Sequence, residues 1–211
     1  MARSAGSRAD AEWRCQVALP FFTIGHSTRS LDDFIALLRG VEIALLVDIR
    51  TIPRSRTNPQ FNKDALPAAL APAGIDYEHI AALGGLRGKM RDKTGAAPDV
   101  NGFWTNKSFH NYADYALSEP FRAGLEHLRD EGHRRRCAIM CSEAVWWRCH
   151  RRIVSDYLIG AGETVFHIMD HDREGHVRLE PARLTAGAVV EGPDTIVYPA
   201  VATPAAARDE A

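Results

Sequence analysis

The segment from Cys141 to Arg151 brings two cysteines close to a histidine and two arginines. A cysteine reacts as its thiolate, and a nearby cation or a helix N-terminus lowers the pKa of the thiol. Because Arg148 and Arg151 could supply that cation, we expect Cys141 to act as a thiolate or as a ligand. Cys149 or His150 would then be its partner, in a nucleophile–base pair or a redox pair.

Further proton-exchanging groups surround Cys141. We expect Glu143 and His150 to act as acid/base or orienting groups, since both residue types serve widely as general acids and bases. His26 follows Gly25 at the end of an apolar run, and it could act as a general acid or base or cap the edge of a sheet. The alternative interpretation of Cys141 is a buried cysteine that packs as a small hydrophobic residue.

Metal binding is a second interpretation of the same group. Nitrogen and sulfur ligands favour zinc or iron. The residues that could provide them are His26, Cys141, Cys149 and His150. Seven residues separate the two cysteines, whereas compact structural zinc sites commonly place about two to four residues between them.

A further polar group follows an apolar run at residues 43–47. Asp48 could act as a base or orient a ligand, and Arg50 could bind an anion. Alternatively, the two form a structural ion pair that holds the loop at residues 50–63. The residues that we expect to contact the substrate are Arg50, Arg54, Ser55, Arg148 and Arg151.

Basic and aromatic residues also collect in the predicted loops. The basic residues are Arg50, Arg54, Arg56, Lys63, Arg87, Lys89, Arg91 and Lys93, and the aromatic ones are Tyr77, Trp104, Phe109, Tyr112, Trp146 and Trp147. Together they would suit a small anionic ligand of nucleotide-like chemistry. The alternative is a module that binds or senses a nucleotide or a nucleic acid, through phosphate contacts and base stacking.

Short apolar runs alternate with helical patterns along the chain. The predicted strands are 21–24, 43–47, 75–80, 137–141 and 164–169, and the predicted helices cover about 31–40, 64–74, 110–118, 120–131 and 148–160. Uninterrupted apolar runs are typical of parallel strands buried on both faces. We expect a long loop at 81–109 and a hairpin-like turn around Gly175 at 170–180.

This alternation predicts an α/β fold in which a mostly parallel sheet is flanked by helices, a Rossmann-like three-layer arrangement. In such a sheet, ligands bind beyond the carboxyl ends of the strands. Since His26, Asp48 and Cys141 each lie at or just after a strand end, we expect them to converge. We expect a lead-in at 1–19, one α/β domain at 20–185 and an Ala/Pro-rich C-terminal extension at 186–211.

The composition excludes several classes of protein. Of the 211 residues, 45% are hydrophobic and 25% charged, which is ordinary for a globular protein and excludes a wholly disordered chain. No apolar run reaches the roughly 20 residues that a membrane-spanning helix needs. The first residues lack the apolar core of a secretory signal, and three of the four cysteines cluster, so we expect a reducing cytoplasm and no membrane partner.

Several motifs in this order also resemble one known family. They are Phe22-Thr23-Ile24-Gly25-His26-Ser27, Val47-Asp48-Ile49-Arg50, Pro53-Arg54-Ser55, Asn58-Pro59-Gln60-Phe61-Asn62, Cys141-x-Glu143 and Cys149-His150-Arg151. The chain is similar to domain of unknown function family 488 over about residues 21–185. The resemblance implies a bacterial or archaeal soluble α/β protein and no particular reaction. The segment Val145-Trp146-Trp147 departs from the smaller or charged residues that we expect in relatives.

Taken together, the residues favour an enzyme that acts by hydrolysis or group transfer on a small anionic substrate. A nucleotide- or nucleic-acid-binding module and a Cys/His metal-binding protein are the alternatives. Trp146 and Trp147 could seal a pocket or form a contact in a homodimer, since exposed aromatic residues often mark interfaces.

Overall fold

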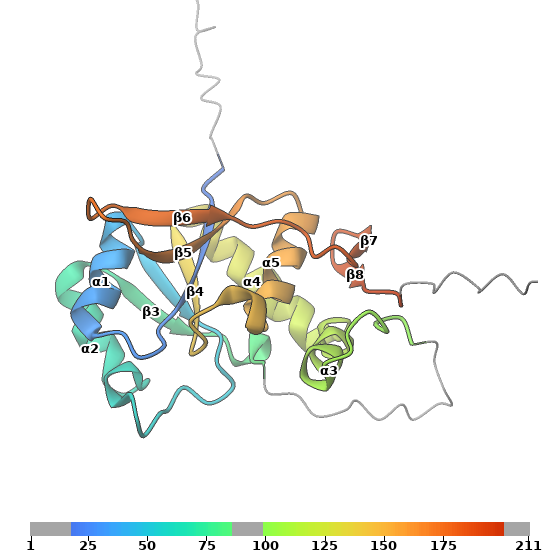
Figure 1. The fold of residues 1–211 in the computed structure, drawn as a ribbon, viewed down its shortest axis with the longest axis horizontal. Coiled ribbons are helices and arrows are strands. Elements are labelled where there is room, and N and C mark those ends of the chain that lie inside the picture. The colour runs from blue at the N-terminus through green and yellow to red at the C-terminus, as the bar shows by residue number, and fades with distance from the viewer. Residues whose placement is uncertain (1–17, 86–98, 201–211) are drawn as a thin grey trace, which may run out of the picture.

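The computed structural model describes residues 18–85 and 99–200. Its centre is a six-stranded sheet in the order β3-β2-β4-β1-β5-β6 (Figure 1). The strands are β1 (Phe21–Gly25), β2 (Leu45–Asp48), β3 (Asp76–His79), β4 (Cys137–Cys141), β5 (Val165–His171) and β6 (Val177–Pro181). The first five pair in parallel, and β6 pairs with β5 antiparallel at the edge. The predicted α/β class is therefore confirmed.

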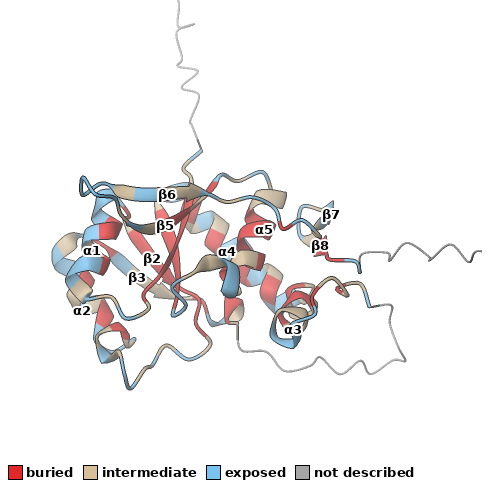
Figure 2. Cartoon of the chain, viewed as in Figure 1, coloured by how far each residue is buried: buried red, intermediate tan, exposed pale blue. Residues whose placement is uncertain are grey.

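Helices cover both faces of this sheet, which gives three layers. They are α1 (Leu31–Gly40), α2 (Leu66–Leu70), α3 (Lys107–Ala116), α4 (Glu119–Arg134) and α5 (Arg151–Gly160). Phe22 and Ile24 of β1 pack with α1 and α2, whereas Phe21 packs on the other face with α4 and α5. The alternation follows from the pleat of the strand, since neighbouring side chains point to opposite faces. Figure 2 shows the buried strands between the two helical layers.

Local sequence signals explain where several elements begin and end. The side chain of Ser30 accepts a hydrogen bond from the backbone N–H of Asp33, which caps α1 as its sequence predicts. Gly175 has a positive φ of 85° in the turn between β5 and β6, where the hairpin was expected. No helix among the described residues has the length and apolar character to cross a membrane.

The chain after residue 185 contains more structure than its composition suggests. It forms a two-stranded antiparallel sheet from β7 (Val189–Gly192) and β8 (Thr195–Val197). Ile196 and Tyr198 are fully buried in the same core as α5. The Tyr198 hydroxyl donates to Asp156 of α5 at 2.9 Å. Residues 189–198 therefore pack onto the domain that we expected to end at 185.

Other differences lie between the strands. The predicted loop at 81–109 contains a 3₁₀ turn at Ala81–Leu83, and α3 begins at Lys107 within it. The helix predicted from residue 148 starts at Arg151, after a separate 3₁₀ turn at Trp146–Arg148. This turn positions the residues between Cys141 and α5.

Candidate functional site

A cleft of about 880 Å³ opens at the carboxyl ends of β1, β2 and β4, which are neighbours in the sheet. The residues of the predicted site that line it are His26, Arg50, Arg54, Ser55, Cys141, Glu143, Arg148, Cys149 and His150. Asp48 and Arg151 lie behind it and are almost completely buried. The expected convergence at the strand ends thus forms one cleft.

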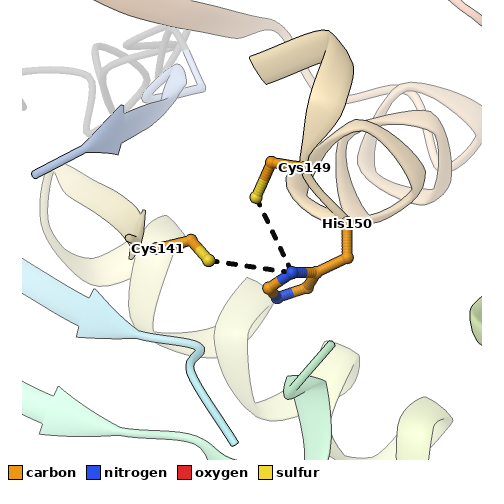
Figure 3. A group of neighbouring side chains, drawn as sticks. All are labelled: Cys141, Cys149 and His150. Atoms are coloured by element: carbon orange, nitrogen blue, oxygen red, sulfur yellow. Dashed lines mark hydrogen bonds between the residues drawn. The ribbon is translucent and has the colours of Figure 1, made fainter. Parts of the chain in front are cut away.

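At the base of the cleft, Cys141, Cys149 and His150 form a compact group that we call the Cys–His cluster. His150 Nδ1 lies 3.8 Å from Cys141 Sγ and 3.6 Å from Cys149 Sγ (Figure 3). The three donor atoms all lie within 4.8 Å of one another. The end of β4 supplies one sulfur, and the residues before α5 supply the other sulfur and the imidazole.

The imidazole of His150 has a defined orientation. Its Nε2 lies 3.1 Å from the carbonyl oxygen of Ile49, which can only accept a hydrogen bond, so Nε2 carries the proton. In this tautomer, Nδ1 is the nitrogen that faces the two sulfurs with a lone pair. Gly85 packs against the ring so closely that an added Cβ would lie 2.2 Å from Nδ1. Only glycine at position 85 leaves the imidazole in this place.

Arg151 is buried next to the cluster and donates hydrogen bonds to Cys149. Its side chain is 1% exposed, and its Nε and backbone N–H donate to Cys149 Sγ at 3.4 and 3.5 Å. The Nη2 of Arg151 donates a hydrogen bond to the carbonyl oxygen of Glu143 at 2.6 Å. Gly25 permits this approach, because a Cβ there would lie 1.8 Å from that same carbonyl oxygen. Arg151 thus holds the loop and Cys149, and it is not placed to bind a substrate.

The two thiols differ in their electrostatic surroundings. Burial raises the pKa of Cys149, but the Cys141 thiol and Arg151 stabilise its thiolate and bring the pKa down to about 6. For Cys141, the hydrogen bond with Cys149 and burial raise the pKa to about 12. The sequence predicts that Cys141 acts as a thiolate or as a ligand. The structure directs the stabilising donors to Cys149 instead, because they come from the start of α5.

Asp48 and Arg50 form a buried structural pair. Arg50 Nη2 donates to one carboxylate oxygen of Asp48 at 2.6 Å, and Nε donates to the other at 2.9 Å. Tyr77 adds a hydroxyl donor at 2.7 Å. Arg50 Nη2 also reaches the carbonyl oxygen of Phe61 at 2.6 Å. These contacts favour the interpretation in which Asp48 and Arg50 form an ion pair that holds the loop at 50–63. They do not favour Asp48 as a base or Arg50 as an anion-binding residue.

His26 lies apart from the Cys–His cluster. Its Nδ1 donates to the carbonyl oxygen of Ser27 at 2.9 Å, and its Nε2 accepts from Arg50 Nη1 at 3.3 Å. The ring stacks on Phe61 with centroids 4.4 Å apart. Burial is the largest cause that lowers its pKa, to about 4. His26 is therefore neutral, both of its nitrogens are engaged, and it is not one of the three residues that could hold a metal together, although the metal-binding alternative included it.

The remaining predicted residues form the walls of the cleft. Glu143 and Arg148 are exposed, and neither forms an ion pair with another residue in the described ranges. Arg54 is exposed and lies 3.3 Å from Asp64. The Ser55 hydroxyl accepts from the backbone N–H of Asn58 at 3.0 Å and so shapes its own loop. Among the described residues of the predicted site, Glu143 and Arg148 are thus without an ion-pair partner.

Most of the aromatic residues that we expected near a ligand have other positions. Phe109 lines the cleft, and Trp104 stacks on it at 4.8 Å. Trp146 stacks on the buried ring of His167 at 4.3 Å, which anchors the loop between the two cysteines. Trp147 is 45% exposed. Neither tryptophan of this pair lines the described part of the cleft.

Part of the predicted basic loop cannot be placed. Arg87, Lys89, Arg91 and Lys93 lie outside the described residues.

Sequence reasoning missed two contributors to the site, Gly85 and the backbone carbonyl of Ile49. The paired glycines at 84–85, a few residues after the predicted strand at 75–80, were the available signal of a close backbone approach.

A family model described as "Domain of unknown function DUF488" matches residues 30–158. No curated protein and no solved structure matches the chain. The matched residues include the whole Cys–His cluster and both residues of the buried ion pair.

Proposed function

The chain belongs to the DUF488 family, and we propose that it is an enzyme that acts by hydrolysis or group transfer on a small anionic substrate. One observation carries the proposal. The exposed side chains of Glu143 and Arg148, which form no ion pair within the described part of the chain, line the same cleft as the Cys–His cluster. A carboxylate, a guanidinium and a thiol–imidazole group in one cleft can exchange a proton, bind an anion and assist bond cleavage.

The size and lining of the cleft support a substrate of nucleotide-like size. Its volume of about 880 Å³ lies within the range of roughly 300–1,000 Å³ that small-molecule sites occupy. Phe109 offers an aromatic side chain at the edge of the cleft, and Trp104 supports it. Arg148 would bind the anionic group, because a guanidinium can donate two hydrogen bonds to a phosphate or carboxylate.

The roles differ among the residues of the cleft. Glu143 would accept or donate a proton, since no described partner occupies its carboxylate. Arg54 would add positive charge at the rim, where Asp64 already balances part of it. Asp48, Arg50 and Arg151 would act as positioning residues, because their polar atoms bind other parts of the protein.

Binding of AMP, measured by titration calorimetry, tests the anion site. We expect Arg148→Ala to weaken binding by about tenfold or more, which corresponds to roughly 1.4 kcal/mol. Arg134→Ala is the matched control, because Arg134 is also exposed but lies at the end of α4, before β4, where it pairs with Glu131. Equal affinities in the two variants would refute the anion site.

Turnover tests the chemical role separately. In an assay of phosphate release from a panel of nucleotides and phosphate monoesters, Glu143→Gln should lower the rate by about 10²–10⁴-fold with little change in AMP affinity. Absence of AMP binding together with salt-dependent binding of single-stranded DNA would refute the proposal and favour a nucleic-acid-binding module.

A further inference from the structure

We infer that Cys141, Cys149 and His150 hold a zinc ion whose fourth coordination position opens into the cleft. Two thiolate sulfurs and one imidazole nitrogen form a ligand set that zinc accepts readily. The donor atoms already lie within 4.8 Å of one another. Zinc binding goes beyond the proposed function, since a metal can bind here without any substrate.

The distances agree with tetrahedral coordination. Bond lengths of about 2.3 Å to sulfur and about 2.0–2.1 Å to nitrogen, at an angle near 109°, place sulfur and nitrogen about 3.6 Å apart. The observed separations from His150 Nδ1 are 3.6 Å to Cys149 Sγ and 3.8 Å to Cys141 Sγ. A zinc ion could therefore bind with only small movements of the side chains.

The surroundings of His150 match those of a metal-ligating histidine. Such a residue usually donates its second ring N–H to a carbonyl or carboxylate, which fixes the ring and leaves the other nitrogen for the metal. His150 Nε2 makes this contact with the carbonyl oxygen of Ile49. Gly85 packs against the same ring at Nδ1. The ring is thus held in place by the end of β2 and by the segment after β3.

The charge of Arg151 gives an independent reason for an anionic cluster. Its guanidinium is buried and forms no ion pair with a carboxylate in the described ranges. A buried charge without a partner is costly. Its hydrogen-bond partners are Cys149 Sγ, the Thr23 hydroxyl and two backbone carbonyls. Cys149 is the one partner in this set that can carry a negative charge, as a zinc-bound thiolate would.

The open position determines the kind of site. Structural zinc ions are usually enclosed by four protein ligands, whereas catalytic ones keep a position for water or substrate. The Cys–His cluster offers three protein ligands, and all three residues line the cleft. His26 does not complete the set, because its Nε2 faces Arg50. An anionic oxygen held by Arg148 could instead occupy the fourth position.

Elemental analysis of untagged protein, purified without chelators, tests this inference. We expect about one zinc per chain. Cys149→Ser and His150→Ala should lose the metal. Cys137→Ala should retain it, because Cys137 lies on the same face of β4 as Cys141 but at the opposite end of the strand, where it is fully buried in the core.

A second measurement does not depend on whether the variants fold. Wild-type protein stripped with a chelator should bind one added Co²⁺, with a thiolate-to-cobalt charge-transfer band and the d–d absorption of tetrahedral cobalt. The zinc site is refuted if folded wild-type protein holds only a trace of zinc and gives no such spectrum. One equivalent of iron in place of zinc would also refute the assignment of the metal.

The two proposals can fail separately. If AMP binding depends on Arg148 while folded wild-type protein neither holds zinc nor binds added Co²⁺, the cleft binds anions and the zinc site is wrong. If zinc binds to the cluster and AMP does not bind, the metal site stands without the proposed substrate class.

Discussion

The buried pair of Asp48 and Arg50 allows a quantitative test of how the site is held. The perturbation is Asp48→Asn, which keeps the shape of the side chain and removes its charge. The carboxylate oxygens accept from Arg50 Nη2 at 2.6 Å, from Arg50 Nε at 2.9 Å and from the Tyr77 hydroxyl at 2.7 Å. An asparagine has one acceptor oxygen, so at least one of these donors loses its partner.

The expected loss of stability follows from burial. Hydrogen bonds to charged groups contribute about 1.5–3 kcal/mol each, and breaking a buried ion pair costs about 3–5 kcal/mol. Asp48 is fully buried and Arg50 is 6% exposed, so solvent screens neither charge. We therefore expect Asp48→Asn to lower the free energy of unfolding by about 3–5 kcal/mol, and the Tm by about 10 °C.

Urea unfolding followed by circular dichroism measures this change. Asp64→Asn is the matched control, since Asp64 also pairs with an arginine, Arg54, but both side chains are more than 70% exposed. Exposed pairs contribute little, so the control should unfold like the wild type. Equal stabilities of the two variants would refute the argument that the buried pair holds the loop at 50–63.

Three further predictions concern other parts of the structure. Gly85→Ala should weaken zinc binding by about 10–100-fold in a competition with a chelator, because the new Cβ displaces the imidazole ligand. Burial lowers the pKa of His167 to about 3. As the pH falls, the imidazole of His167 is therefore protonated in the unfolded chain before it is protonated in the folded protein. Stability should therefore fall as the pH drops from about 6.5, by at most about 1.4 kcal/mol per pH unit from this residue. Tyr198→Phe should cost about 2 kcal/mol in urea unfolding, because Asp156 loses a buried hydroxyl donor.

Each of these predictions has a clear contrary result. Gly192→Ala places its Cβ in open space, and a loss of zinc in that variant equal to that of Gly85→Ala would remove the steric explanation. His167→Gln should flatten the pH dependence of unfolding, and an unchanged slope would contradict the assignment. If Tyr198→Phe unfolds like the wild type, the C-terminal segment contributes little to the fold.

Sequence patterns predicted the centre of the fold because its strands are buried on both faces. The apolar runs that became β1, β2 and β4 carry no polar alternation, which is the mark of central parallel strands. Parallel strands end at the same edge, so the convergence of Cys141 with the other reactive residues followed from topology. The C-terminal strands were missed, since each has at most four residues and β7 has no buried position.

The hydrogen-bond partners of the residues in the cleft could not be predicted from the sequence pattern. Cys149 receives the hydrogen bonds of Arg151 because α5 begins two residues after it. Asp48 is occupied because Tyr77 reaches it from the neighbouring strand. The first contact is local but depends on how the chain turns before α5, and the second joins residues that are 29 positions apart. The sequence could therefore identify the participants but not their partners.

The most direct test of the proposed function is the position of AMP in a crystal of the protein. We expect the phosphate to accept hydrogen bonds from Arg148, with the ligand lying in the cleft above Cys149 and His150. The account is contradicted if AMP, supplied well above its measured Kd, is ordered at another surface and the cleft contains only solvent.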